Sequence, residues 1–124
     1  TKQLQALAQQ LAVQVQIVNG TTFIGATVQV SNAEALKKIC TELKLIQPEL
    51  VIVLCANIGG KAAVAVSIAD SIGKANGLDA GKIIKETVAP LIKGGGGGQK
   101  TLATAGGQEI NHLDKVIAAV KALL

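Results

Sequence analysis

A run of five glycines, Gly94–Gly98, followed by Gln99, Lys100 and Thr101, is the segment that most resembles a phosphate-binding motif. It differs from the P-loop pattern G-x-x-x-x-G-K-[ST] only where Gln99 replaces the second glycine. A P-loop joins a strand to a helix, so that backbone N–H groups and the helix dipole meet the phosphates. Here the apolar spacing predicts a helix before the run and a strand after it, so nucleotide hydrolysis is not expected. Consecutive glycines also lack the spacing of a dinucleotide-binding GxGxxG motif.

Two thiols and one imidazole are the remaining candidates for metal or nucleophilic chemistry. Cys40 and Cys55 are not in CxxC spacing, and His112 is the only histidine. A metal site made of these three scattered residues is the less favoured alternative to buried free thiols in a reducing compartment. The sequence shows no nucleophile–base pair and no paired carboxylates, so we expect no catalytic residue and a structural role for all three.

The glycine run has three other interpretations. A flexible linker is the commonest meaning of polyglycine, but residues 99–124 are too few to form a separate domain beyond it. A tight turn needs only one or two glycines. A loop without side chains would instead let another backbone, such as a sugar–phosphate chain, come close to exposed N–H groups. We therefore expect a polyglycine loop inside one fold that serves as a contact surface.

The charge pattern limits what such a surface could recognise. The chain has a net charge of +4, and all 12 basic residues are lysines. Lysine is a point charge without the bidentate fork of arginine, and Phe23 is the only aromatic residue. Between residues 74 and 100 there are five lysines, and the only carboxylates in this segment are Asp79 and Glu86. Charge alone favours a solvated lysine face; a bound nucleic acid would be contacted through its phosphates and shape, with little base readout.

Apolar periodicity predicts the elements that must position these residues. It indicates helices over 1–15, 31–45, 80–93 and from 111 onward, with Ser31 and Asp79 as caps and Pro90 kinking or shortening the third. Strands are expected on both sides of the Asn19-Gly20 turn and over 50–56, 61–69 and 101–105. This order predicts an α/β (α+β) fold, a mixed β-sheet with helices packed on it, preceded by the end of an N-terminal helix.

Residues 50–72 form the most apolar stretch, but Asn57, Gly59, Gly60 and Lys61 interrupt it. A membrane span is therefore not expected. No signal peptide is visible, and we expect a cytoplasmic protein. The chain begins with Thr1 and could be a fragment of a longer protein.

Residues 78–108 resemble the signature of the C-terminal, DHH-associated domain of alanyl-tRNA synthetases. The matching parts are Asp79-Ala80-Gly81, the glycine run, and the closing A-x-A-G-G over 103–107. Many synthetases have Arg-Pro-Asp after the glycines, where this chain has Gln99-Lys100-Thr101. DHH-type phosphoesterases, which share the domain, typically have a histidine directly after their glycines. None stands there in this chain, which favours the synthetase branch.

The resemblance implies a non-catalytic domain that binds the outer corner of tRNA and helps to join aminoacylation and editing. Residues 1–17 would be the end of a helical dimerisation segment, and 18–124 the globular domain. The implied RNA-binding residues are Lys82, Lys85, Lys93, Gly94, Gly95, Gly96, Gly97, Gly98, Gln99 and Lys100. No cofactor is implied for this segment; the parent would ligate alanine to tRNA with ATP and hold zinc in its editing domain. The alternatives are a nucleic-acid-binding lobe of a DHH phosphoesterase and a purely structural assembly domain.

Overall fold

The computed structural model describes residues 6, 9–10, 15–18, 20–28, 33–46, 50–69, 72, 77, 79–99, 101–111 and 113–122. Their strands form one six-stranded sheet in the order β1-β2-β3-β4-β6-β5. The strands are β1 (Gln16–Val18), β2 (Thr21–Val28), β3 (Val51–Ile58), β4 (Lys61–Ile68), β5 (Gly94–Gly98) and β6 (Leu102–Gly107). The helical segments are α2 (Ala33–Ile46), α4 (Ala80–Ile83), the π-helical η1 (Ile84–Val88), α5 (Ala89–Ile92) and α6 (Leu113–Ala122).

The sheet is mixed, as the sequence predicts. Strands β2 and β3 run parallel and are connected through α2, whereas every other neighbouring pair is antiparallel. The β1–β2 turn contains Gly20, with φ of 79°, and Gly59 and Gly60 form the β3–β4 turn with φ of 60° and 87°. These left-handed angles favour glycine, which explains why both hairpins turn where they do.

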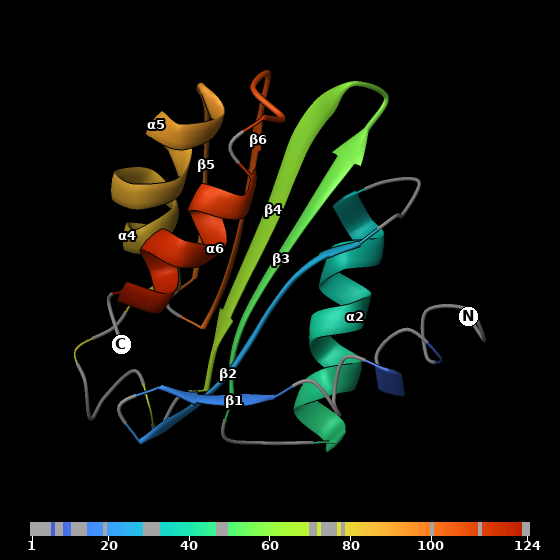
Figure 1. Ribbon diagram of the computed structural model, residues 1–124, viewed down its shortest axis with the longest axis vertical. Helices are drawn as coiled ribbons and strands as arrows, with labels where there is room; N and C mark the ends of the chain where they lie inside the picture. The colour runs from blue at the N-terminus through green and yellow to red at the C-terminus, as the bar shows by residue number, and fades with distance from the viewer. Residues whose placement is uncertain are drawn as a thin grey trace.

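The helices lie on both faces of the sheet, with α2 on one face and α4, α5 and α6 on the other (Figure 1). Each face has its own apolar core. The core under α2 includes Ile24, Leu36 and Leu54, and the core on the opposite face includes Phe23, Val64 and Ile84. Six consecutive residues of β3, 51–56, are buried, which confirms the prediction of a strand covered on both faces.

The helix that leads into the glycine run begins where the sequence predicts. The Asp79 carboxylate caps it by accepting a hydrogen bond from the Lys82 backbone N–H at 3.1 Å. Its middle widens into η1, where the Ala89 N–H donates to the Ile84 carbonyl five residues earlier. Pro90 lacks an N–H and its ring disturbs the preceding turn, so this wider turn lets the helix continue to Ile92.

The prediction of a polyglycine loop is wrong. The run forms β5, an edge strand paired antiparallel with β6 in unbroken register from Gly94↔Gly107 to Gly98↔Ala103. The closing Gly106-Gly107 also lies inside β6 rather than after it. A glycine run carries no alternation of side chains, so its sequence could not reveal a strand.

Several sequence predictions fall on residues outside the described part. Ser31, Lys74, Lys100, His112 and most of residues 1–17, which hold most of the expected helical segment, lie there. Within the described residues, no helix is both long and apolar enough to cross a membrane.

Candidate nucleic-acid interface

Strand β5 presents main-chain atoms at the edge of the sheet. Its glycines are exposed except for the half-buried Gly97, and among the described strands it pairs with β6 alone. None of the five has a positive φ, so any amino acid could adopt the backbone conformation of this strand. The requirement for glycine must therefore come from what lies close to the strand.

Three of the glycines are required by β6 itself. A Cβ on Gly96 would lie 2.6 Å from the Ala105 Cα and closer still to the Thr104 carbonyl oxygen. A Cβ on Gly98 would lie 2.6 Å from the Leu102 carbonyl oxygen, and one on Gly94 would overlap the Gly106 carbonyl. These contacts are with backbone atoms, which cannot move aside without breaking the strand pair.

The two glycines between them are not required by packing. A Cβ on Gly95 would meet no atom within 4 Å among the described residues. A Cβ on Gly97 would meet only the Cε atom of Lys85, at 3.4 Å, which is ordinary van der Waals contact with the end of a flexible side chain. Packing within the fold thus explains the glycines at 94, 96 and 98. It does not explain why Gly95 and Gly97 are glycines.

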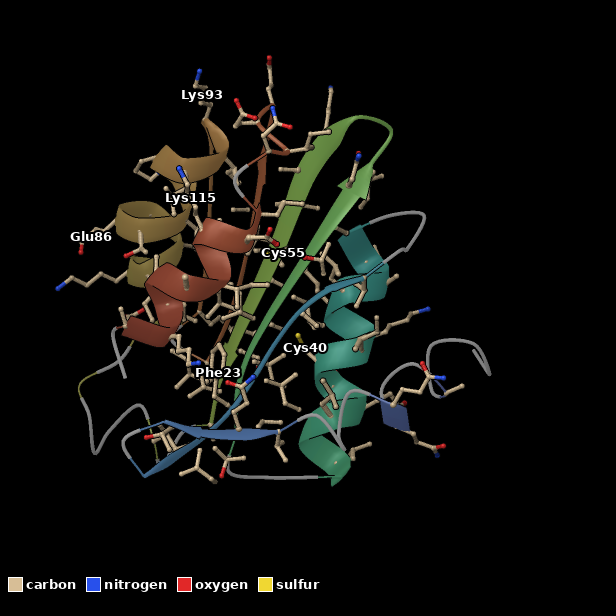
Figure 2. All side chains as sticks on the ribbon, in the orientation of Figure 1. Phe23, Cys40, Cys55, Glu86, Lys93 and Lys115 are labelled. Carbon is tan, nitrogen blue, oxygen red and sulfur yellow. The ribbon has the colours of Figure 1, made fainter. Side chains whose placement is uncertain are left out.

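The structure brings two of the predicted lysines to this strand. Lys93 immediately precedes β5 and is exposed at the end of α5 (Figure 2). Lys85 lies on η1 and its side chain reaches Gly97, while Lys82 is exposed one turn earlier on the same helix. Gln99 is exposed, and its backbone N–H donates to the Leu102 carbonyl at 2.9 Å, closing the β5–β6 turn.

A groove of about 760 Å³ lies beside the glycine strand. Lys93 and Gly94–Gly97 form one side of it. The other lining residues come from β4, from β6 and the following Gln108, and from both ends of the β3–β4 turn. Lys61 and Gln108 line this groove, and the sequence interpretation missed both of them. No spacing along the chain places Lys61 near the glycine run. Only the strand order β4-β6-β5 brings it there.

The cysteines are buried and form no disulfide, as predicted, and they belong to different faces of the sheet. Cys40 lies in the core under α2, and Cys55 in the core under α6 (Figure 2). The described residues contain no group of three His, Cys, Asp or Glu side chains that could hold a metal ion. The Cys55 thiol donates to the Leu113 carbonyl at 3.8 Å, so it ties β3 to the start of α6.

Burial, with a smaller contribution from the charge of Asp114, raises the pKa of Cys55 from 9.0 to about 12. In the folded chain at pH 8, iodoacetamide should therefore leave Cys55 unmodified, and it should alkylate this thiol once urea unfolds the chain. Because the pKa of Cys55 is higher in the folded chain than in the unfolded chain, the protonated thiol favours the folded state. This contribution to the free energy of unfolding is fully present below pH 9 and is lost as the pH rises toward 12. Mass-spectrometric mapping of the alkylated sites checks this. Rapid native labelling of Cys55 would contradict the buried position.

A family model that describes the DHHA1 domain matches residues 20–124, which include strands β2 to β6 and therefore the glycine strand. The chain belongs to the DHHA1 domain family. Among curated relatives of this DHHA1 chain, the alanine–tRNA ligase of Cytophaga hutchinsonii is 40% identical over 119 residues, covering 96% of the chain. That of Lactiplantibacillus plantarum is 43% identical over 96 residues, covering 77% of the chain.

The DHHA1 chain spans 14% and 11% of the lengths of these two ligases. Its fold is that of the C-Ala domain of Aquifex aeolicus alanyl-tRNA synthetase, with a TM-score of 0.79, 23% identity, and coverage of 89% of this chain and 96% of that one. A DHH-domain member of the s1p family of ribosomal proteins gives a TM-score of 0.59 at 19% identity. It covers 98% of this chain and 31% of its own. The mixed α+β fold class is thus confirmed.

Proposed function

We propose that this DHHA1 domain is a non-catalytic tRNA-binding domain of an alanyl-tRNA synthetase, with the glycine strand as its RNA contact. The observation that carries the proposal is the pair Gly95 and Gly97. Packing does not require either residue to be glycine, and both lie on an exposed strand. A sugar–phosphate backbone can approach such a strand closely and accept hydrogen bonds from its outward N–H groups.

The charges around β5 support the same ligand. Lys82, Lys85 and Lys93 are exposed on the helix that contacts β5, and Glu86 is the one carboxylate among residues 80–93. Lysines neutralise phosphates without reading base edges, so recognition would rest on the shape of a folded RNA. The sequence kinship with alanine–tRNA ligases makes tRNA the folded RNA that we propose.

The wider role follows from the same kinship. We propose that the domain binds the outer corner of tRNA and helps to join aminoacylation with editing in a cytoplasmic parent enzyme. That parent would ligate alanine to tRNA with ATP and carry zinc in its editing domain, and residues 1–17 would contribute to a homodimer. Sedimentation with and without residues 1–17 tests the last point, because a monomer in both cases would remove the dimer from the account.

The binding proposal predicts that the chain prefers folded tRNA to a single strand of equal length in gel shifts at low salt. The affinity should fall steeply as salt is added, because lysines that bind phosphates release counterions. Replacing Lys93 and Lys100 together by alanine should weaken binding about 10-fold or more at 50 mM salt. Equal affinity for the two RNAs, or an unchanged affinity of the double variant, would contradict the proposal.

The phosphoesterase alternative shares the fold, since the DHH-domain structure also resembles this chain. Its discriminating feature lies upstream in the parent protein. A DHH motif with several aspartates there would favour a phosphoesterase, and a class II synthetase core with an HxxxH editing motif would favour the ligase.

A further inference from the structure

Three polar side chains form a row across the ends of β4, β6 and β5. Ala62 of β4 pairs with Gly107 of β6, and Gly107 pairs in turn with Gly94 of β5. One residue beyond each of these positions stand Lys61, Gln108 and Lys93, which are all exposed and all line the groove. Strand pairing therefore sets side by side three residues that are far apart in the sequence.

The row has the dimensions of a short stretch of nucleic-acid backbone. Lys61 and Lys93 are two strand spacings apart, roughly 10 Å between their main chains. One strand of a duplex carries about one charge per 3.4 Å of helix axis, so two lysines at this spacing lie within an axial length that holds about three charges of one strand. The Gln108 amide stands between them and can donate a hydrogen bond to a phosphate oxygen.

The backbone has a defined turn geometry at both ends of the row. Lys61 follows the two-glycine turn of the β3–β4 hairpin, in which the Asn57 side chain accepts a hydrogen bond from the Gly60 N–H at 2.9 Å. Lys93 has φ of 52° and ψ of 53°, and it is the one non-glycine residue with positive φ in the described part of the chain. This conformation is costly for a residue with a side chain, so the position would be cheaper as glycine.

The groove between the two lysines is suited to a backbone rather than to bases. Its lining contains Lys61 and Lys93 and no carboxylate, and its floor is made of small residues such as Ala63, Thr104 and Gly106. The nearest carboxylate along the chain, Glu109, accepts a hydrogen bond from the Asn111 N–H at 2.9 Å. No aromatic or arginine side chain is present in the lining to stack on a base.

We propose that Lys61 and Gln108 are RNA-binding residues, and that the row Lys61–Gln108–Lys93 carries the phosphate backbone of the RNA from the glycine strand across to the β3–β4 hairpin. This inference rests on the proposed function, since the RNA strand is the one that contacts β5. It extends the interface to a hairpin outside the glycine signature. It also predicts that the footprint on the RNA is wider than β5 and its helix alone would make.

The test measures the affinity of the chain for folded tRNA at several salt concentrations, for Lys61→Ala and for a matched control. Lys121→Ala is the control, because Lys121 is exposed in the last turn of α6 and does not line the groove. Lys61→Ala should weaken binding about 5-fold at 50 mM salt and lower the slope of log K against log salt by about 0.7 to 0.9. Lys121→Ala should change neither quantity.

Gln108→Ala gives a second, uncharged test. It should weaken binding about 3-fold and leave the salt slope unchanged, because an amide releases no counterion. Thermal melts verify that each variant is folded. Suppose that the wild type binds tRNA and Lys93→Ala weakens binding, but Lys61→Ala behaves like Lys121→Ala. The proposal that the row binds RNA is then wrong, and the proposed function stands. If wild type shows no binding to tRNA, the proposed function itself fails.

Discussion

Replacing Gly96 by alanine is expected to lower the free energy of unfolding by about 3 kcal/mol. The added Cβ would lie 2.6 Å from the Ala105 Cα and 2.9 Å from the Ala105 Cβ, and closer still to the Thr104 carbonyl oxygen. No side-chain rotation relieves a contact between two backbones, so β5 must separate from β6 or the pair must distort. For a domain of this size the midpoint of a thermal melt should fall by about 10 °C.

Gly95→Ala is the matched control, because it makes the same chemical change one residue away on the same strand. Among the residues that the structure describes, none has an atom within 4 Å of a Cβ at this position, and the backbone angle suits alanine. Removing a glycine there restricts the unfolded chain, so the free energy of unfolding should be unchanged or raised by about 0.4–1 kcal/mol. Equal melting temperatures of Gly95→Ala and Gly96→Ala would show that β5 does not pair with β6 in the described register.

Unlike Gly96→Ala, Gly95→Val should retain the fold and lose RNA binding. Valine favours strands and its side chain would project into open space, so the melting temperature should not fall. If a sugar–phosphate backbone lies against β5, the isopropyl group would hold it away from the strand. The affinity for folded tRNA should then drop about 10-fold or more, since several short contacts are lost together.

The size of the side chain provides an internal check on this result. Gly95→Ala should weaken binding less than Gly95→Val, because a methyl group displaces the RNA by a smaller distance. Lys121→Ala should leave the affinity unchanged, as it lies away from the groove. Wild-type affinity in a folded Gly95→Val chain would mean that the RNA does not approach this strand. RNA contact would then not explain the glycine at position 95.

Much of the fold could be predicted because its signals are local. The Asn19-Gly20 turn, the Asp79 cap and the apolar run in β3 each act on a few neighbouring residues, and the structure has each element where these signals place it. The mixed sheet follows from their order. The π-helical turn before Pro90 could not be predicted, because either a kink or an early end would also accommodate the ring.

The candidate site was predicted less completely, because its geometry is set by strand pairing. The glycine run has no side chains and hence no periodicity, so its sequence predicts a loop, whereas pairing with β6 makes it a strand. Its lysine neighbours Lys85 and Lys93 were found because they are close in sequence. Lys61 and Gln108 were missed because only the order β4-β6-β5 brings them beside Lys93.

The most direct test of the account is a titration of the ¹⁵N-labelled chain with folded tRNA, followed by the amide signals of Gly94–Gly98. If β5 contacts the RNA, these signals should shift or broaden at the first additions, together with those of Lys61 and Lys93. The amides of Lys37 and Lys38, exposed on α2, should stay unchanged until the whole spectrum broadens. Changes confined to α2, with the glycine signals unmoved while the RNA is bound, would contradict the assignment of β5 as the RNA contact.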